Sequence, residues 1–599
     1  MAYDSIAARL YAQARLRPEE PAYFNKVGGR WRGTRWREYA AEARRAARAL
    51  VAIGVEAGET VALLGFNRPE WVTLYLAALS VGAAPVGIYT TCSASEVAYI
   101  VEHAAAKVLL VEDMAQWAKF IEARPQMASV VRVVFYRDAA AADDPAAVGW
   151  EAFLALGDGV DDGEVEARLA AIEPHDLATL IYTSGTTGPP MGVMLSHATV
   201  AWTAEAAQRL TGAEAGEVLL SYLPLSHIAE QMLTVHGGVT VGLTVYFAES
   251  MATVRDDLLA SQPSVFFGVP RIWEKFYAAL SVRLAQATGA KKHLVAWARW
   301  AARNYHQRAD RSEPVPPGVR AQYRLAQRLV FSKLKPALGL GNARMCVSGA
   351  APVGREVLEF FQSLDVPIRE VYGQSEDCGP TSFNMPGATK LGTVGRAIPG
   401  VTVRLADDGE LLVRGPNVFL GYYKDAAATD ETLRDGWLHS GDLAQCDDEG
   451  FITITGRKKE ILITSGGKNI TPKNAEEALK AHPLVAEAVL IGDRRPYLVA
   501  LVVVSPEGLA ELATQEGLDP AALTQSGGEH PAVRAVVDTL VARYNQSVAR
   551  VETIKKFAIL PRPLDLEHDE LTPSLKIKRR VVLKNWADTI EALYAEADA

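Results

Sequence analysis

The stretch Ile181-Tyr-Thr-Ser-Gly-Thr-Thr-Gly-Pro-Pro-Met-Gly-Val193 constrains this chain more than any other. Two apolar residues end a predicted strand, and six small residues, Thr183 to Gly188, follow it. Four of the six carry hydroxyl groups and two have no side chain, so backbone N–H groups can converge on an anion while a hydroxyl ligates a cation. The Walker ending Gly-Lys-Ser/Thr does not occur in the chain. A surface turn is the plainer interpretation of such a cluster, but motifs further along the chain favour a phosphate-binding loop.

The bulk composition indicates a globular protein of more than one domain. A chain of 599 residues is too long for a single hydrophobic core. A net charge of −9 argues against general nucleic-acid binding. The four cysteines are widely scattered without a CxxC pair, and the N-terminus lacks a basic segment followed by an apolar one. Both features favour a cytoplasmic location.

Two uncharged stretches, Trp71–Ser95 and Gln231–Ala248, are long enough to suggest membrane-spanning helices. Each is interrupted by Gly, Thr or Pro, and each mixes helix-like with strand-like patterning. We therefore interpret both as buried segments of an α/β fold.

Predicted strands alternate with helices along the first part of the chain. Strands are expected from Thr60, over Ala84–Ile88, over 107–112 and over 130–136, with a helix from about Pro69. This alternation predicts parallel sheets covered by helices on both faces. Residues 137–170 are rich in Ala, Asp and Gly and predict a loop with a weak helix. The last ~140 residues predict a small α+β domain by pattern.

Two motifs beyond the first loop also fit a nucleotide. Ser348-Gly-Ala-Ala-Pro352 follows a predicted strand, and its small residues let an adenine lie against the backbone. Glu370-Val-Tyr-Gly-Gln-Ser-Glu376 supplies an aromatic face, a hydroxyl and a carboxylate within seven residues. This combination suits a nucleotide with Mg²⁺, which takes one or two carboxylates together with phosphate oxygens.

These motifs resemble the signature segments of the adenylate-forming (AMP-binding) superfamily, which includes acyl-CoA synthetases, luciferases and peptide-synthetase adenylation domains. The matching motifs occur in family order, and the resemblance extends from about residue 30 to residue 590. Beyond those already quoted, they include Leu223-Pro-Leu-Ser-His227, Gly436-Trp-Leu-His-Ser-Gly-Asp442, the segment 456–470 and Leu571-Thr-Pro-Ser-Leu-Lys-Ile-Lys-Arg579. The segment Pro263–Lys275 resembles long-chain and very-long-chain fatty acyl-CoA synthetases.

The resemblance implies a role for individual residues. It implies catalytic roles for Lys576, Glu376 and His227, with His227 shaping the carboxylate site, and Mg²⁺ ligation by Thr183 and Glu376. It implies stacking of Tyr372 on adenine, contact of Ser375 with phosphate and of Asp442 with ribose, and a hinge at Lys459. The residues implied in binding ATP or AMP are Thr183, Ser184, Gly185, Thr186, Thr187, Gly188, Gly349, Ala350, Ala351, Glu370, Val371, Tyr372, Gly373, Ser375, Asp442, Arg457 and Lys576.

The resemblance further implies a two-domain ligase that uses ATP and CoA as co-substrates. Residues 1–456 would form a large domain of α/β sheets covered by helices that binds ATP and the acyl group, and residues 457–599 a small, mobile α+β domain. A fatty carboxylate would attack the α-phosphorus of ATP to give acyl-AMP and pyrophosphate, and the CoA thiol would then displace AMP. Rotation of the small domain about Lys459 would separate the two steps.

Residues 282–335, here called the basic insert, differ from the rest of the chain. They contain twelve Lys and Arg residues but only two acidic ones, Asp310 and Glu313. Two helices are expected, over Ala290–Arg311 and Val319–Leu334, around a proline-rich turn. Two interpretations stay open. The insert is either a solvated basic face or a peripheral contact with an anionic membrane that supplies the fatty acid.

Other functions within the superfamily also stay open. A luciferase-like enzyme, a peptide-synthetase adenylation domain or a ligase for another carboxylate would share the same loops. A nucleotide-binding protein with little catalysis is a further alternative, because Met191 stands where family members usually carry Lys. A thioether cannot attract phosphate as an ammonium group does.

If the loop has only lost a phosphate contact, Met191→Lys should tighten ATP binding or raise the adenylation rate. A charge-assisted hydrogen bond contributes about 1.5–3 kcal/mol, which corresponds to about a ten- to hundredfold effect. ATP–pyrophosphate exchange measures it. An unchanged or lower rate would show that the site has adapted to the thioether.

Overall fold

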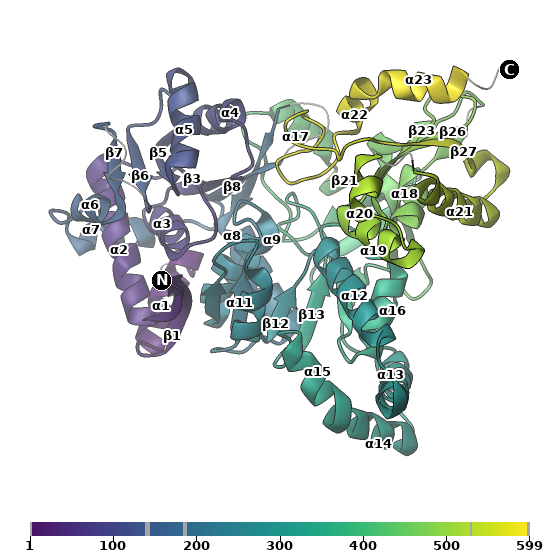
Figure 1. The fold of residues 1–599 in the computed structure, drawn as a ribbon. Helices are drawn as coiled ribbons and strands as arrows, with labels where there is room; N and C mark the ends of the chain where they lie inside the picture. The colour runs from purple at the N-terminus through teal and green to yellow at the C-terminus, as the bar shows by residue number, and fades with distance from the viewer. Residues whose placement is uncertain (1–2, 138–143, 184–188, 467, 527–529, 596–599) are drawn as a thin grey trace.

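The computed structural model describes residues 3–137, 144–183, 189–466, 468–526 and 530–595 (Figure 1). It has a large N-terminal part of mixed α/β structure, built around two extended sheets, and a C-terminal α+β domain. This is the fold class that the sequence predicts.

One extended sheet contains the predicted strands of the first 200 residues. Its order over the described residues is β19-β9-β8-β4-β3-β5-β6-β7, and β3 pairs in parallel with both β4 and β5. The strands are β3 (Thr60–Leu64), β4 (Ala84–Ile88), β5 (Ala106–Val111), β6 (Arg132–Phe135), β7 (Ala147–Gly149), β8 (Leu177–Thr183), β9 (Met191–Ser196) and β19 (Gly421–Tyr422). The residues of β3 and β4 are all buried, as expected for strands covered on both faces.

Helices cover this sheet and continue the alternation of strands and helices. They are α2 (Trp36–Ile53), α3 (Pro69–Ser80), α4 (Ala94–Ala104), α5 (Met114–Ala123), α6 (Trp150–Ala155) and α7 (Asp162–Ala170). Pro69 opens α3 as predicted, because its fixed φ suits the first helical position. Residues 144–170 are more regular than predicted, since β7, α6 and α7 lie there. Their Ala-rich segments gain order by packing against α2 and α3.

The second extended sheet carries the later motifs. Its order over the described residues is β16-β15-β14-β13-β12-β10-β11-β1-β2. The strands are β1 (Pro21–Val27), β2 (Arg30–Arg35), β10 (Val218–Ser221), β11 (Thr244–Phe247), β12 (Val265–Phe267), β13 (Met345–Ser348), β14 (Ile368–Tyr372), β15 (Ser382–Phe383) and β16 (Arg396–Ala397). Its helices are α1 (Ile6–Leu16), α8 (His197–Thr211), α9 (Ile228–Glu230), α10 (Gly238–Val241), α11 (Val254–Ser261), α12 (Pro270–Ala285) and α16 (Arg355–Ser363).

The two apolar stretches are buried α/β segments, as predicted. The first contains α3 and β4, and the second contains a π-helix (Gln231–Gly237), α10 and β11. No helix in the described part of the chain has both the length and the apolar character needed to cross a bilayer.

A smaller sheet follows, and it corrects one prediction. Strands β17 (Thr402–Leu405), β18 (Glu410–Arg414), β20 (Leu433–Arg434), β21 (Trp437–Cys446) and β22 (Ile452–Arg457) form it, with α17 (Ala426–Thr432) alongside. The sequence pattern predicts that Asp442 begins a strand. Asp442 instead lies in the middle of β21, because pairing with β18 and β20 begins the strand already at Trp437. A hairpin turn follows β21 at residues 447–450, where the Asp447 N–H donates to the Phe451 carbonyl.

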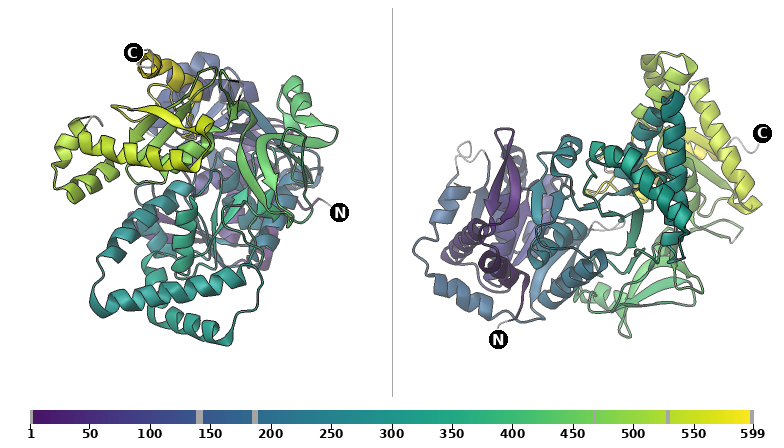
Figure 2. Two further views of the ribbon diagram at one scale, coloured as in Figure 1. Left: turned by 90° about the vertical axis from the view of Figure 1, so that its right-hand side faces the viewer. Right: turned by 90° about the horizontal axis from the view of Figure 1, so that it is seen from below.

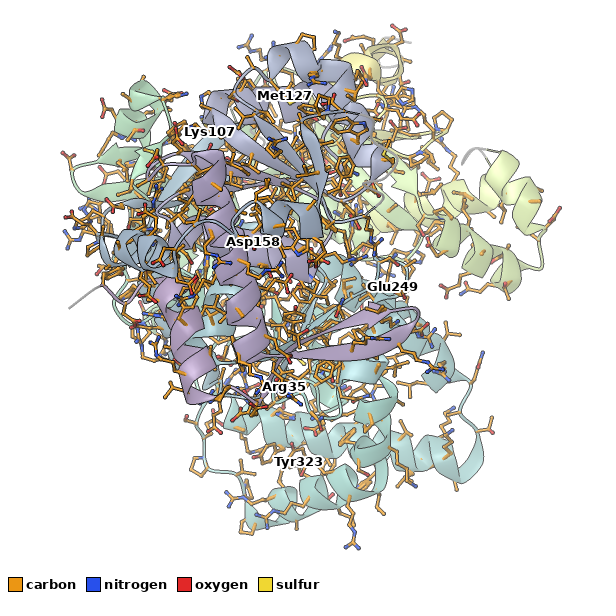
Figure 3. The ribbon with its side chains drawn as sticks, turned by 90° about the vertical axis from the view of Figure 1, so that its left-hand side faces the viewer. Arg35, Lys107, Met127, Asp158, Glu249 and Tyr323 are labelled. Carbon is orange, nitrogen blue, oxygen red and sulfur yellow. The ribbon has the colours of Figure 1, made fainter. Side chains whose placement is uncertain are left out.

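The basic insert forms two long antiparallel helical segments, close to the predicted bounds. They are α13 (Gly289–Ala309) and α14 (Pro317–Ala326), and α14 continues through a π-helix (Gln327–Phe331) into α15 (Ser332–Ala337). These helices lie at one end of the large part (Figures 1 and 3), where Tyr323 is labelled. Asp310 anchors the insert, because its buried carboxylate pairs with Arg369 of β14 at 3.2 Å.

The C-terminal domain is a three-stranded sheet with helices on both faces (Figure 2). It contains β23 (Leu462–Ile463), β24 (Asn469–Ile470), β25 (Val485–Ile491), β26 (Leu498–Val504), β27 (Ile554–Ile559), α18 (Pro472–Lys480), α19 (Pro506–Glu516), α20 (Pro520–Gln525), α21 (Pro531–Ser547), α22 (Arg579–Asn585) and α23 (Ala587–Ala595). Alternate residues of β26 enter two separate apolar clusters, because successive side chains of a strand point to opposite faces.

Candidate functional site

The first motif forms a hairpin between two strands. Antiparallel pairing of β8 with β9 places Thr183 opposite Met191. The predicted phosphate-binding residues Ser184, Gly185, Thr186, Thr187 and Gly188 lie outside the described residues. Met191 is half-buried and packs against the large apolar core, so its thioether has a packing role here. A Cβ at Gly192 would lie 3.2 Å from the Tyr182 ring and 3.3 Å from Tyr423, which explains the small residue.

The second and third motifs lie side by side because β13 and β14 are parallel neighbours. Ser348 pairs with Glu370, so residues 349–351 and 371–376 leave the same edge of the sheet. A Cβ on Gly349 would lie 2.6 Å from a methyl carbon of Val371, which fixes the close approach of the two loops. Ala350 has a φ of 67° and is exposed beside them, as is Ala351. Burial raises the pKa of Glu370 to about 8, so this carboxyl is mostly protonated at neutral pH.

The loop after β14 is a tight turn that requires glycine. A Cβ on Gly373 would lie 1.3 Å from the Gly379 carbonyl oxygen. The Gln374 N–H donates to Asp377 at 2.6 Å, and the Gly379 N–H returns to the Gln374 carbonyl at 3.0 Å. Ser375 and Glu376 are half-buried in this turn.

Glu376 is connected to the first hairpin. The Tyr422 hydroxyl donates to one carboxylate oxygen of Glu376 at 2.9 Å, and Tyr422 pairs through its backbone with Val193 of β9. The Phe419 N–H also donates to the Glu376 carbonyl at 2.9 Å. Two sequence motifs almost 200 residues apart therefore share one structural unit.

Asp442 links three segments. Its carboxylate accepts from the Tyr372 hydroxyl at 2.7 Å and from Gln374 Nε2 at 2.6 Å, and it pairs with Arg457 Nε at 3.1 Å. Burial raises the pKa of Tyr372, and the charge of Asp442 raises the pKa of Arg457. Sequence reasoning missed Gln374, although it stands inside the quoted motif, because its partners Ser440 and Asp442 lie on another strand.

His227 is half-buried and caps the short helix α9. Its Nδ1 accepts the Ala229 N–H at 3.1 Å, so the proton of the neutral ring lies on Nε2. Burial, with the positive charge of Lys576 as a second cause, lowers the pKa of His227 to about 4. A neutral imidazole with a free Nε2–H can donate a hydrogen bond to a carboxylate oxygen.

Lys576 lies on a hairpin of the C-terminal domain, residues 571–578, that is closed by a bridge between Leu571 and Ile577. The residue is exposed, yet it lies close enough to the large part for charges of Glu376 and Asp442 to act on it. Desolvation is the main cause that lowers the pKa of Lys576, and the charge of Arg457 adds to it. The carboxylates of Glu376 and Asp442 act in the opposite direction. The structure thus brings Lys576 into electrostatic contact with His227, Arg457, Glu376 and Asp442.

The residues fit a hard cation at one point. Glu376 has one carboxylate oxygen without a hydrogen-bond donor among the described residues. Its partner Tyr422 pairs with β9, and the β8–β9 hairpin carries the Thr183 hydroxyl. Carboxylate and hydroxyl oxygens are the ligands that Mg²⁺ takes together with phosphate and water. No group of three or more His, Cys, Asp or Glu residues in the described chain forms a metal site by itself.

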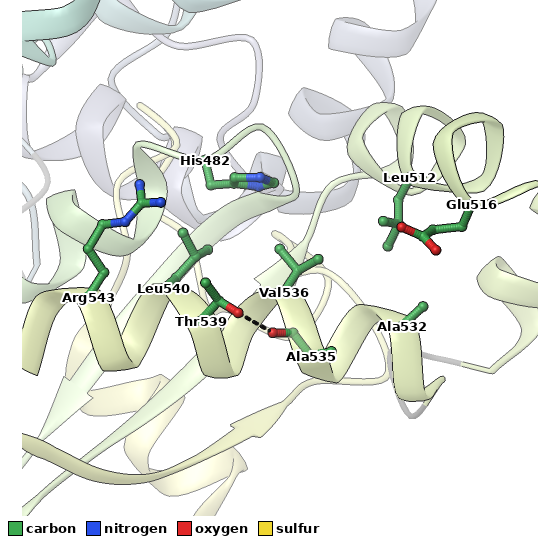
Figure 4. Close-up of a pocket in the computed structure, with 9 residues that line it drawn as sticks. All are labelled: His482, Leu512, Glu516, Ala532, Ala535, Val536, Thr539, Leu540 and Arg543. Carbon is green, nitrogen blue, oxygen red and sulfur yellow. Dashed lines mark hydrogen bonds between the residues drawn. The ribbon is translucent and has the colours of Figure 1, made fainter.

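One hollow lies away from these residues. A cavity of about 370 Å³ on the C-terminal domain opens between α19 and α21 (Figure 4). Its lining residues are His482, Leu512, Glu516, Ala532, Ala535, Val536, Thr539, Leu540 and Arg543. None of them belongs to a sequence motif, so the candidate site is defined by the motif residues.

Known proteins resemble this chain over nearly its full length. Residues 10–423 match the family described as AMP-binding enzyme, and residues 459–598 match the AMP-binding enzyme C-terminal domain. The long-chain-fatty-acid–CoA ligase FadD15 of Mycobacterium tuberculosis is 37% identical over 99% of this chain and 97% of its own length. The long-chain-fatty-acid–CoA ligase ACSBG2 of Homo sapiens is 34% identical over 96% of this chain and 90% of its own.

Solved structures support the fold. The anthranilate CoA ligase AuaEII in complex with anthranoyl-AMP has a TM-score of 0.72 at 20% identity and covers 99% of this chain and 98% of its own. The O-succinylbenzoate CoA synthetase MenE of Bacillus subtilis in complex with AMP has a TM-score of 0.69 at 22% identity, over 96% and 97% of the two chains. With both family domains matched in order and relatives above 30% identity along the whole chain, this protein belongs to the AMP-binding, adenylate-forming enzymes and is an acyl-CoA ligase, an AMP-forming acid–thiol ligase with ATP and CoA as co-substrates.

Proposed function

We propose that the acid is a long-chain fatty acid and that acyl-CoA forms through acyl-AMP. In the first step a carboxylate oxygen attacks the α-phosphorus of ATP and pyrophosphate leaves. In the second step the CoA sulfur attacks the acyl carbonyl carbon and AMP leaves. The observation that supports the chemistry is that the Lys576 hairpin is bonded to the large part and that the charge of Lys576 acts on His227 and interacts with that of Glu376. The choice of acid is supported by the names of the full-length relatives.

Lys576 and His227 act on the first step in this proposal. Fatty carboxylate and triphosphate are both anions, so their approach needs fixed positive charge where negative charge develops. Lys576 supplies that charge, and the Nε2–H of neutral His227 orients the carboxylate oxygen. Because the pKa of His227 is about 4, the ring keeps this donor pattern throughout the neutral range.

The remaining motif residues hold the nucleotide in this proposal. The Tyr372 ring and residues 349–351 flank the adenine, and Asp442 with Arg457 binds the ribose hydroxyls. Thr183 and Glu376 would hold Mg²⁺. When bound, the ion supplies charge neutralisation on phosphate oxygens.

The contacts around Lys459 support a hinge at that residue. The Lys458 ammonium pairs with Asp408 at 2.5 Å and with Glu410 at 3.0 Å, so residue 458 stays with the large part. Leu462 belongs to the apolar core of the small domain. Only residues 459–461 lie between these two anchors, so a rotation of the small domain must be absorbed there. We accordingly place the division between the domains, expected at residue 457 from the sequence, at residues 459–461.

A weakly catalytic nucleotide-binding protein is the second candidate, and Met191 is the observation that favours it. Its half-buried thioether packs on the core and supplies no charge to the loop. Fatty-acid-dependent ATP–pyrophosphate exchange separates the two candidates, because binding without exchange would support this one.

A series of acids from short to very long tests the proposed substrate class. Each buried methylene contributes about 0.8 kcal/mol, so kcat/KM for CoA-dependent AMP release should rise about fourfold per methylene until the acyl site is filled. The optimum should lie among long chains. Preference for aromatic or short acids would contradict the proposal while leaving the ligase assignment intact.

Lys576→Ala should slow adenylation alone. Loss of one electrostatic donor to a transition state costs about 10²–10³ in rate. Pyrophosphate exchange should fall by that factor, whereas thioester formation from supplied acyl-AMP should persist. Lys578→Ala is the matched control, since Lys578 lies on the same hairpin and pairs with Asp569 at 2.5 Å. Equal loss of both half-reactions in Lys576→Ala would refute the assigned role.

We further propose that the basic insert contacts an anionic membrane surface. Nine of its twelve basic residues are exposed: Arg283, Lys291, Lys292, Arg303, Arg311, Arg320, Arg324, Arg328 and Lys333. Of its two acids, Asp310 is buried against Arg369, which leaves Glu313 at the surface. Trp300, Leu325 and Leu329 are 50%, 49% and 45% exposed among these charges, which suits insertion beside lipid headgroups.

The structure shows which arginines can test this contact. Arg299 donates to the Ser363 hydroxyl at 3.0 Å and stacks on Phe360, and Arg308 donates to the Asn304 carbonyl. Changes at either residue would disturb packing. Arg320, Arg324 and Arg328 are exposed at four-residue spacing and are better probes.

Reversal of Arg320, Arg324 and Arg328 to Glu should abolish binding to anionic phospholipid vesicles. Each basic residue near such a surface contributes about 1 kcal/mol, so the partition coefficient should fall at least a hundredfold in a sedimentation assay. Wild-type binding should also weaken as salt rises. Reversal of the exposed residues Arg30, Arg32 and Lys584 makes the same change in net charge and should bind like wild type. Equal partitioning of wild type and both triple variants would contradict membrane contact and support the alternative that the basic insert is a solvated face.

A further inference from the structure

One side-chain hydrogen bond joins the large part to the hairpin that carries Lys576. The Thr91 hydroxyl donates to the Pro573 carbonyl at 2.5 Å, across 482 positions of sequence. Thr91 lies in no motif, whereas Pro573 lies three residues before Lys576.

The Thr91 side of this contact is held firmly. Thr91 follows β4, and the Cys92 N–H donates to the Tyr89 carbonyl at 3.0 Å. The Lys119 ammonium donates to the Thr90 carbonyl at 2.6 Å, and Ser93 caps α4 through the Glu96 N–H. The turn therefore presents the Thr91 hydroxyl from a fixed position.

The Pro573 side transmits that position to Lys576. The Thr572 N–H donates to the Lys576 carbonyl at 2.7 Å, and the Lys576 N–H returns to the Thr572 hydroxyl at 3.0 Å. The same hydroxyl lies 2.9 Å from that of Ser574. Because these hydrogen bonds make the hairpin rigid, a fixed position of the Pro573 carbonyl also fixes the backbone from which the Lys576 side chain extends.

A second contact joins the two domains away from the site. Arg271, near the start of α12, forms an ion pair with Glu487 of β25, and Lys480 of α18 pairs with the same carboxylate at 3.0 Å. The docking of the small domain therefore does not rest on Thr91 alone. Loss of the Thr91 hydrogen bond should shift the hairpin without releasing the domain.

We propose that Thr91 is a positioning residue for adenylation, which holds the Lys576 hairpin against the large part during that half-reaction. The proposal rests on the role proposed above for Lys576. Thr91 is exposed, so its hydroxyl can donate to water instead of to the Pro573 carbonyl when the hairpin moves away. Such a bond favours the adenylation arrangement without preventing the rotation that the thioester step needs.

Thr91→Val removes the donor while keeping side-chain volume. A neutral hydrogen bond of ordinary net strength predicts a two- to tenfold fall in pyrophosphate exchange. Thioester formation from supplied acyl-AMP should be unchanged or faster. Thr91→Ser keeps the hydroxyl and should restore exchange. Thr90→Val is the matched control, since the Thr90 hydroxyl has no hydrogen-bond partner among the described residues.

Hydrogen exchange supplies a readout that does not depend on turnover. Amides of residues 571–578 should exchange faster in Thr91→Val than in wild type, Thr91→Ser or Thr90→Val. Unchanged exchange of the hairpin, or an equal fall in both half-reactions, would overturn the proposal. Lys576→Ala could leave adenylation intact while Thr91→Val still raises amide exchange of residues 571–578. That result would contradict the role of Lys576 and would support the Thr91 contact between the domains.

Discussion

The carboxylate of Asp442 is the interaction on which the candidate site depends. It accepts from the end of β14 through Tyr372 and Gln374, and it pairs with Arg457 at the end of β22. Three segments that share no local sequence are thereby fixed around one buried acceptor. A buried carboxylate with well-directed donors holds geometry because any partner that leaves exposes an uncompensated charge. The strand that carries Arg457 also leads directly to the proposed hinge, so the motif residues and the chain entering the small domain are both connected to Asp442.

The fold was largely predictable because its strands are short apolar runs between turn residues. Thr60–Leu64 and Ala84–Ile88 follow that pattern. Ser196, a residue type favoured at helix starts, caps α8 by accepting the Thr199 N–H. The position of Asp442 within its strand was not predictable, since it is set by pairing with β18 and β20 rather than by local sequence. The helices α6 and α7 after residue 149 were also not predictable, because their sequence patterns are weak and the helices become ordered only by packing against other elements.

The motif residues were predictable, but most of their partners were not. Tyr372, Glu376 and Lys576 stand in segments with a recognisable order along the chain. Gln374, Tyr422 and Thr91 act through contacts with strands or turns far away in sequence, and no local spacing indicates them. Glu376 is a clear example. Its carboxylate accepts a hydrogen bond from Tyr422, which lies on the two-residue strand β19, and the sequence of this strand does not indicate the contact.

The short connection between Lys458 and Leu462 has a consequence for the concentration of Lys576 at the site. Lys458 is anchored on Asp408 and Glu410, and Leu462 is anchored in the core of the small domain. In the proposed rotation, a tether of three residues would confine the small domain to a small volume, so Lys576 would return to the nucleotide at high effective concentration. Lengthening the tether would dilute Lys576 without altering any contact in the site, and the first half-reaction would slow because the lysine is absent more often. Under the proposed mechanism, the adenylation rate would therefore depend partly on the length of the chain at residues 459–461.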